Sequence, residues 1–249
     1  MQRLVVLGAS NARRCLPTIF SAARAASGTP VKLYGAIGHG RSYGSASSVL
    51  GRALPGILEC GLWAALETSP RDSLDAVVSD AGNDILYGFS VAEILGWVGE
   101  CVSRLEKMGA RITVMGLPVE TVGRLGPARF LLFRSIFFPS SRLRLGTIRG
   151  SVRELDRALR RVASERKLRF VEPRGEWYGF DPIHIRFRDA SAAWAEILGA
   201  PTVSEENLSA LQALRLRLAR PEGESLFGIE HAHAQPAFRA RDGSEIRLY

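Results

Sequence analysis

Short apolar runs alternate with helix-like segments along most of the chain, and this alternation is the feature that most constrains its fold. Strand signals alternating with helical ones are typical of βαβ units, whose parallel sheet is covered by helices on both faces. We therefore predict an α/β fold, a three-layer α/β/α sandwich with a five-stranded parallel sheet. The predicted strands are residues 4–8, 31–37, 75–79, 111–117 and 169–171.

The predicted helices lie between and after these strands, at residues 13–26, 49–66, 90–108, 155–167, 190–198 and 205–218. A hydrophobic content of 46% in 249 residues is enough for a sizeable core. We expect one domain over residues 1–220, followed by a C-terminal extension over residues 221–249. In that extension Asp242-Gly243, between two strand-like runs, predicts a type I′ hairpin.

Residues 123–150 are too long for an ordinary helix-to-strand connection, and long insertions often form lids or binding loops. They contain an aromatic cluster, residues 130–138, among six arginines. Such a cluster more often packs in a core than binds a ligand. Its functional interpretation is a lid that receives an acyl chain or contacts an anionic or lipid surface.

The chain carries 33 Lys and Arg against 25 Asp and Glu, a net charge of +8. The excess is dispersed and no nucleic-acid-binding motif accompanies it, so we expect a solvated basic surface and no nucleic-acid partner. The three cysteines form no CxxC pair, which argues against a disulfide framework and structural zinc and favours a reducing compartment. The first residues leave no room for a secretion signal, so we expect a cytoplasmic protein.

Polar residues and glycines follow four of the predicted strands directly. In parallel sheets, ligands bind at this edge, because loops and helix N-termini face outward there. The carboxyl ends of the strands meet along one edge, so we expect these residues to converge. They are Ser10 and Asn11 after the first strand, His39 and Gly40 after the second, Asn83 after the third, and Asp181 and His184 after the fifth.

The types of these residues match the requirements of acyl transfer. A serine hydroxyl becomes a nucleophile when a base removes its proton, and an acceptor must hold that base in the right tautomer. Asp181-Pro-Ile-His184 offers a base and its acceptor in one short loop. The backbone at Gly40 and the amide of Asn83 are suitable donors to a developing oxyanion.

Four short blocks carry these residues in order: LVVLGASN, AIGHGRSYG, SDAGND and FDPIHI. With these blocks the chain resembles the SGNH (GDSL-type) hydrolase superfamily over residues 4–184. The resemblance implies a flavodoxin-like three-layer sandwich. It also implies Ser10 as nucleophile, His184 as base, Asp181 as its partner, and an oxyanion hole made by the N–H groups of Ser10 and Gly40 and the amide of Asn83. Gly38 fits the second block as well, and we favour Gly40 because it begins the sequence Gly-Arg-Ser.

The first block departs from the superfamily at one position. Ala9 stands where the superfamily usually has an aspartate that supports the nucleophile. A second serine, Ser42, lies in a G-x-S-x-G motif, which is the nucleophile elbow of α/β-hydrolases. Only two predicted strands precede Ser42, and small polar residues follow it, so we favour Ser10 as the nucleophile.

Four residues beside the predicted site are expected to contact the substrate: Asn11, His39, Trp177 and Tyr178. His231 and His233 are interpreted as part of a surface tail, because no third ligand accompanies them, and we expect no metal there. No cofactor is expected either.

These observations predict a serine hydrolase that acts on ester bonds through a Ser10 acyl-enzyme, such as an esterase, lipase or carbohydrate deacetylase. Its substrate is expected to be a small-molecule, carbohydrate or lipid ester. An acyltransferase with the same site is one alternative, because an acyl-enzyme can pass its acyl group to another acceptor. A non-catalytic module that binds a phosphate-bearing ligand through its Gly-rich loops is another. Attachment to a membrane surface through residues 130–138 is a third.

Overall fold

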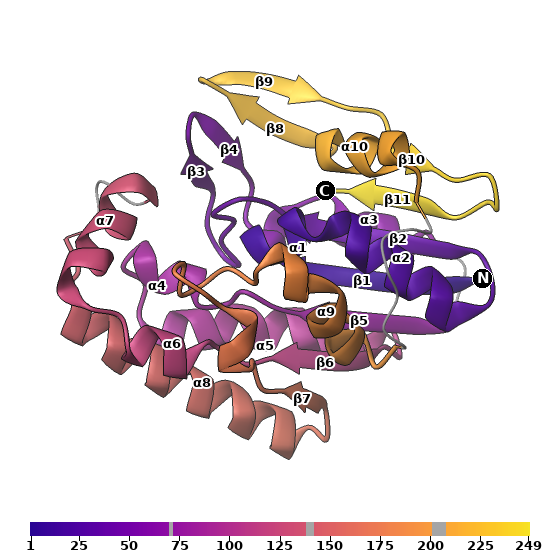
Figure 1. The fold of residues 1–249 in the computed structure, drawn as a ribbon. Helices are drawn as coiled ribbons and strands as arrows, with labels where there is room; N and C mark the ends of the chain where they lie inside the picture. Colours follow the sequence, from indigo (N-terminus) through magenta and orange to yellow (C-terminus); the bar gives the residue numbers. More distant parts are fainter. Residues whose placement is uncertain (70–71, 138–141, 201–207) are drawn as a thin grey trace.

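The computed structural model describes residues 1–69, 72–137, 142–200 and 208–249. Its central sheet (Figure 1) has seven strands in the order β10-β11-β2-β1-β5-β6-β7. The α/β class and the five predicted strands are confirmed. These five strands are parallel: β1 (Gln2–Gly8), β2 (Val31–Ile37), β5 (Leu74–Val78), β6 (Arg111–Met115) and β7 (Arg169–Val171).

The prediction of a five-stranded sheet is wrong in number, because the C-terminal residues add two strands to it. β11 (Glu245–Leu248) runs parallel to β2, and β10 (Phe238–Arg239) pairs with β11 in the antiparallel sense. The last strand of the chain therefore lies beside one of the first, and the edge of the five-stranded core is covered by a hairpin.

This hairpin forms around Asp242-Gly243 as predicted, but its turn is not of type I′. That type requires positive φ at both central residues, and Gly243 has a φ of +86° whereas Asp242 is not left-handed. The Ala240 N–H donates to the Ser244 carbonyl (2.8 Å), and the Asp242 carboxylate accepts the Ser244 N–H (3.0 Å). The loop is therefore longer, and the left-handed glycine ends it.

Helices cover both faces of the sheet and enclose two apolar clusters. Successive strand residues point to opposite faces, so Val5 of β1 belongs to one cluster and Val6 to the other. The first face is covered by α3 (Leu62–Glu67), α5 (Val91–Lys107) and α8 (Leu145–Glu165). The second is covered by α2 (Leu16–Ser27), α9 (Ala190–Leu198) and α10 (Ala210–Leu218).

Most helix predictions agree with these elements. α5 and α9 confirm the predictions for residues 90–108 and 190–198, and the predicted helix 13–26 is divided between α1 (Ser10–Arg14) and α2. α8 begins at Leu145 rather than at residue 155. α10 accounts for the end of the predicted helix 205–218, whose first residues, 205–207, lie outside the described residues.

The helix predicted over residues 49–66 is wrong. This stretch contains β3 (Ser47–Val49), β4 (Arg52–Leu54), the 3-10 helix η1 (Ile57–Glu59) and α3. β4 pairs with β8 (Gly223–Leu226), and β9 (Ile229–Ala232) completes a second, antiparallel sheet in the order β3-β4-β8-β9. Pairing with strands from the far end of the chain overrides the local helical preference here.

The insertion over residues 123–150 follows α6 (Val119–Gly123) and contains α7 (Pro127–Phe137). Phe130 is buried in the first apolar cluster, whereas Leu131 and Leu132 are 50% and 48% exposed. Residues 138–141, which include the end of the predicted aromatic cluster, lie outside the described residues. α7 therefore packs on the core through one face and presents leucines to solvent on another.

Two further sequence features are visible in the described part of the chain. The three cysteines are all buried there, and no disulfide joins them. None of the described helices combines the length and apolar character needed to cross a membrane.

Candidate active site

Ser10 lies at the carboxyl end of β1, in the middle of the parallel sheet. β1 ends at Gly8, and Ser10 is the first residue of α1. A Cβ atom on Gly8 would lie 2.4 Å from the Ser79 Oγ, so the close approach of β1 and β5 requires glycine here. The tight strand-to-helix turn presents the Ser10 side chain at the edge where β5 also ends.

Ser10, His184 and Asp181 form a continuous hydrogen-bonded chain. The Ser10 Oγ lies 2.7 Å from the His184 Nε2, and the His184 Nδ1 lies 2.6 Å from the Asp181 Oδ2. The Asp181 Oδ1 also accepts the N–H groups of Ile183 (3.1 Å) and His184 (3.2 Å). Both carboxylate oxygens therefore hold the loop that directs the imidazole toward the serine.

The environment of Asp181 favours its ionised form. Burial raises its pKa, but the hydrogen bond and charge of His184 and the N–H groups of Ile183 and His184 outweigh burial. The net pKa of Asp181 therefore lies below its ordinary value. An ionised acceptor at Nδ1 selects the His184 tautomer whose Nε2 is able to take a proton from Ser10.

Asp80 lies in the third sequence block, SDAGND, but the sequence motifs assign it no role. It has a left-handed backbone (φ +58°) directly after β5, and its carboxylate meets the first turn of α1. Its Oδ2 accepts the N–H groups of Ala9 (2.9 Å), Asn11 (3.1 Å) and Ala12 (3.3 Å). The Ser10 N–H is not among these donors. The first sequence block has Ala9 in place of the superfamily's usual aspartate. Asp80 provides a carboxylate at the N-terminus of α1 from another loop.

Asn11 connects the nucleophile turn to the histidine loop. Its side-chain amide donates to the Asp80 Oδ1 (2.8 Å) and to the Ile183 carbonyl (2.9 Å), and its Oδ1 accepts the Ile185 N–H (2.8 Å). Ile183 and Ile185 flank His184. Asn11, predicted to contact substrate, lines the cavity beside Ser10, and the bonds of its polar atoms also fix the loop that carries His184.

The predicted oxyanion donors come from two neighbouring loops. Gly40 has a φ of +65°, and a Cβ atom there would lie 2.2 Å from the Val49 Cγ2 and 2.8 Å from the Tyr87 hydroxyl. Asn83 begins α4 (Asn83–Leu86), and its amide donates to the carbonyl of Arg41, the residue after Gly40 (3.3 Å). This bond joins the glycine loop to Asn83.

A cavity of about 90 Å³ lies beside Ser10 and Asn83. Tyr178 also lines it and is 5% exposed, and among the described residues its hydroxyl has no hydrogen-bond partner. Burial, followed by the charge of Asp80, raises the pKa of Tyr178, so its hydroxyl remains a donor. The rest of the wall is largely apolar: Met115, Leu117, Val122, Ile148, Val152 and Ile183.

Two other sequence predictions are clarified by burial. Trp177, predicted to contact substrate, is almost completely buried in the second apolar cluster and is not among the residues that line the cavity. Ser42, the alternative nucleophile, is fully buried, and its hydroxyl accepts the N–H groups of Gly44 (3.3 Å) and Ser45 (3.1 Å). Its contacts are those of a turn residue.

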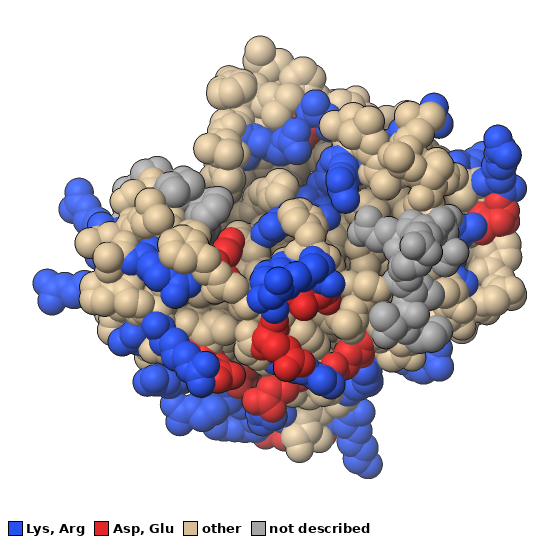
Figure 2. Space-filling view, viewed as in Figure 1, with Lys and Arg blue, Asp and Glu red and all other residues tan. Residues whose placement is uncertain are grey.

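Basic groups surround the site. Arg13 donates to the carbonyls of Leu216 (3.2 Å) and Ala219 (2.8 Å) at the end of α10. Partial desolvation, then the charges of Arg13 and His184, lower the pKa of His39 to about 4. His39 is exposed to solvent and is neutral at pH 7. Figure 2 shows Lys and Arg side chains beside the hollow in the upper half of this face.

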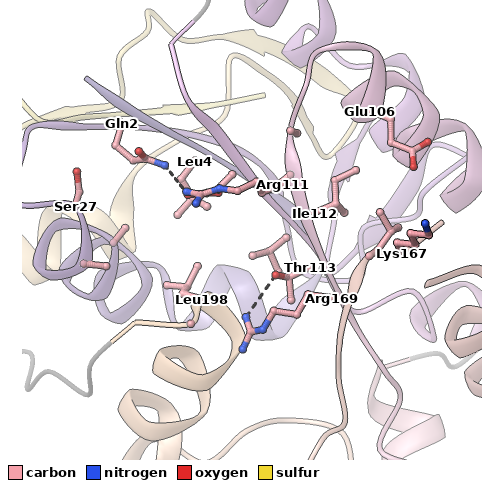
Figure 3. A pocket seen from close by; sticks show the side chains of 18 of the residues that line it. Gln2, Leu4, Ser27, Glu106, Arg111, Ile112, Thr113, Lys167, Arg169 and Leu198 are labelled. Carbon is pink, nitrogen blue, oxygen red and sulfur yellow. Dashed lines mark hydrogen bonds and ion pairs between the residues drawn. The ribbon is translucent and has the colours of Figure 1, made fainter. Parts of the chain in front are cut away.

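A wider cavity, of about 820 Å³, lies at the opposite edge of the sheet (Figure 3). Two of its arginines have partners within the chain: Arg111 pairs with Asp75 (2.7 Å), and Arg169 donates to the Ile197 carbonyl (2.7 Å). None of the described residues that line it is a histidine. We therefore place the reactive site at the smaller cavity, where Ser10 and His184 meet.

The tail histidines have partners of their own. His233 lies 3.2 Å from the Glu224 carboxylate, and its ring stacks on that of His231 with centroids 6.3 Å apart. Within the described ranges, no group of three or more His, Cys, Asp or Glu side chains is arranged to hold a metal ion.

Comparison with known proteins identifies the fold. No protein-family model matches the sequence, and no curated protein matches it. The structure of the psychrotrophic esterase EstA from Pseudoalteromonas sp. is 13% identical, covers 80% of this chain and 95% of its own, and has a TM-score of 0.50. The aryl esterase of M. smegmatis is 16% identical, covers 78% and 97%, and has the same TM-score of 0.50. The chain has the SGNH (GDSL-type) hydrolase fold.

Proposed function

We propose that the chain is a serine hydrolase that cleaves ester bonds, with Ser10 as its nucleophile. The observation that carries this proposal is the hydrogen-bonded chain from Ser10 through His184 to Asp181 at the carboxyl end of β1. A base within hydrogen-bond reach of a serine, itself oriented by a carboxylate, is the arrangement that activates a hydroxyl. The esterases that share the fold support the same class.

The geometry supports a two-step mechanism. The Ser10 Oγ attacks the carbonyl carbon of the ester while the His184 Nε2 takes its proton, and the carbonyl oxygen becomes an oxyanion. The tetrahedral adduct then collapses, the bond to the alcohol breaks, and the alcohol leaves with the proton from His184. Water repeats these steps on the acyl-enzyme, releases the acid and restores Ser10.

The oxyanion needs hydrogen-bond donors beside Ser10. Asp80 takes the N–H groups around Ser10 but not that of Ser10 itself. We assign this N–H, the Gly40 N–H and the Asn83 amide to the oxyanion. Losing one such donor typically costs about 100- to 1,000-fold in kcat.

The cavity beside Ser10 favours a short acyl group. A volume of about 90 Å³ corresponds to about three water-sized groups, which suits acyl chains of about two to four carbons. The apolar wall matches the carbon chain, and the buried Tyr178 hydroxyl offers one donor to an oxygen of the substrate. Acetyl to butyryl esters are therefore the substrates that fit this site.

Asp80 also bears on the alternative of a phosphate-binding module. A phosphate at a helix N-terminus binds backbone N–H groups, but those of Ala9, Asn11 and Ala12 are already bonded to the Asp80 carboxylate. This internal carboxylate occupies the place that a phosphate needs, which favours the ester hydrolase.

The test combines active-site labelling with ester hydrolysis. A fluorophosphonate probe is expected to label the wild-type chain, and Ser10→Ala is expected to abolish labelling. Ser10→Ala and His184→Ala should each lower hydrolysis of p-nitrophenyl acetate by at least about 1,000-fold. Ser42→Ala is the matched serine control, and folding of each variant is checked by circular dichroism. Equal rates in wild type, Ser10→Ala and His184→Ala would refute the mechanism.

An acyl-length series tests the substrate. We expect p-nitrophenyl acetate and butyrate to be cleaved at least about 10-fold faster than the octanoate, since each misplaced methylene is worth about 1–3 kcal/mol in a tight pocket. Ile148→Ala enlarges the far wall and should extend the range toward hexanoate. An octanoate preference in the wild type would contradict a short-acyl site while leaving the role of Ser10 intact.

A further inference from the structure

Two tight turns at the tips of the small antiparallel sheet carry large apolar side chains into solvent. Leu50-Gly51 joins β3 to β4, and Phe227-Gly228 joins β8 to β9. Val49 pairs with Arg52, and Leu226 with Ile229, so each loop has two residues. Leu50 and Phe227 are each 86% exposed, and Ile229 is 64% exposed.

Both turns have a backbone that does not suit these side chains. Leu50 has a φ of +53° and Phe227 of +49°, and the glycines that follow are also left-handed. Two-residue loops with both φ values positive are type I′ turns, which favour Asn, Asp or Gly at the first position. A bulky residue there is an outlier. The exposed Leu50 and Phe227 side chains bury little against the described residues to offset this strain.

The two turns lie side by side and form one surface. The Phe227 N–H donates to the Gly51 carbonyl (2.7 Å), and Arg52 pairs with Leu226. A Cβ atom on Gly51 would lie 2.4 Å from the ring of Phe227, so this ring covers Gly51. We call Leu50, Phe227 and Ile229 the apolar tip. Figure 1 shows both turns projecting from the body of the molecule, and in Figure 2 the end of this projection carries no blue or red side chain.

The apolar tip is connected to the reactive site. Val49, the residue before Leu50, packs against Gly40 in the glycine loop, because its Cγ2 occupies the space of a Gly40 Cβ. Helix α7, which carries the half-exposed Leu131 and Leu132 and also Arg129 and Arg134, lies at the same end of the molecule (Figure 1). The tip therefore adjoins the glycine loop of the proposed site.

We propose that the apolar tip inserts into the surface of an anionic lipid bilayer and holds the reactive site close to it. Side chains at convex turn apices suit a fluid apolar phase, which needs no complementary groove, and exposed apolar patches of this kind mark membrane or protein contacts. The chain's net charge of +8 complements anionic lipids, which attract Lys and Arg within a Debye length of the surface. This docking is independent of the chemistry at Ser10.

Vesicle flotation tests the proposal with the full chain. We expect binding to vesicles of phosphatidylcholine and phosphatidylglycerol (7:3), with weaker binding at high salt and on pure phosphatidylcholine. The double variant Leu50→Asn/Phe227→Asn should bind at least about 10-fold more weakly. Asn suits a type I′ turn, so this variant keeps the fold, which thermal unfolding will confirm.

The control replaces two exposed leucines of α10, Leu211 (57% exposed) and Leu214 (52%), in the variant Leu211→Asn/Leu214→Asn, and should leave vesicle binding unchanged. Ser10→Ala should also bind as the wild type does, which separates docking from substrate capture. Absence of wild-type binding to the anionic vesicles, or equal binding of the Leu50→Asn/Phe227→Asn variant, would overturn the proposal. So would a wild-type dimer in light scattering that this variant loses, because the tip would then bind a second copy of the chain.

Discussion

Asp80 and the pair Leu50 and Phe227 share an unfavourable left-handed backbone, with φ values of +58°, +53° and +49°. The Asp80 carboxylate accepts three backbone N–H groups and one side-chain amide at the nucleophile turn. The side chains of Leu50 and Phe227 instead extend into solvent. Strain at Asp80 is offset by bonds that order the site, whereas strain at the tips has no such compensation inside the fold. Asp80 therefore positions the nucleophile turn, whereas Leu50 and Phe227 are suited to contact a surface outside the protein.

The largest effect is expected from removing the Asp80 carboxylate. Asp80→Ala leaves the N–H groups of Ala9, Asn11 and Ala12 and the Asn11 amide without their acceptor. We expect the free energy of unfolding to fall by about 4 kcal/mol. We also expect kcat for p-nitrophenyl acetate to fall about 100-fold with little change in KM, because Ser10 and His184 lose their alignment. Urea unfolding and steady-state kinetics measure the two effects.

A rescue variant distinguishes positioning from general destabilisation. Ala9→Asp in the Asp80→Ala background returns a carboxylate to the nucleophile turn, and we expect it to restore at least about 10-fold in kcat. Asp80→Asn keeps a side chain that tolerates the left-handed backbone but replaces one acceptor oxygen with a donor, and should lie between wild type and Asp80→Ala. A wild-type kcat in a folded Asp80→Ala protein would show that Asp80 does not position Ser10.

A second carboxylate, that of Asp84 in α4, sharpens the comparison, because one of its oxygens has no hydrogen-bond partner among the described residues. Asp84 is fully buried, and its Oδ2 accepts the Tyr43 N–H (3.0 Å). Among the described residues its Oδ1 has no hydrogen-bond partner. Burial raises the pKa of Asp84 to about 6, although hydrogen bonds from Ser42 and Tyr43 oppose the rise.

The sign of the resulting pH dependence follows from this raised pKa. Between about pH 4 and pH 6 the folded state holds a proton that the unfolded state has lost, so stability from this group falls as pH rises through 6. The fall amounts to about 3 kcal/mol. The unfolding free energy is measured at pH 4 and at pH 7.5 in wild type and in Asp84→Asn. The change between the two pH values should differ between the two proteins by about 3 kcal/mol. Parallel pH profiles for the two proteins would exclude a raised Asp84 pKa.

The sequence predicts the parts of this molecule that depend on local pattern. The five parallel strands follow from apolar runs, and the positions of Ser10, Asp181 and His184 follow from their places in the segments after strands. Asp80 also follows a strand, but its role escapes this reasoning, because it depends on a left-handed backbone that brings the carboxylate to another loop.

The same limit explains the errors at the small sheet. Residues 49–66 read as an apolar helix, because Leu50-Gly51 lacks the Asn or Asp that usually marks a type I′ turn. The strand that pairs with β4 comes from the far end of the chain, so no local pattern indicates it. Trp177 illustrates the opposite case, since its position beside the site loop does not reveal that its ring is buried in the core.

The smallest effect is expected at Leu50 and Phe227, whose backbone strain is not offset by contacts inside the fold. Leu50→Asn and Phe227→Asn should each raise the free energy of unfolding by about 0.5–1 kcal/mol in urea, because Asn adopts the left-handed backbone at lower cost than Leu or Phe. Lys167, with a φ of +55° just after the end of α8, is the matched control. Lys167→Gly should stabilise the chain by a similar amount without affecting the tip. If the tip substitutions destabilise the protein while Lys167→Gly stabilises it, Leu50 and Phe227 contribute to folding, and their exposure no longer requires a partner outside the chain.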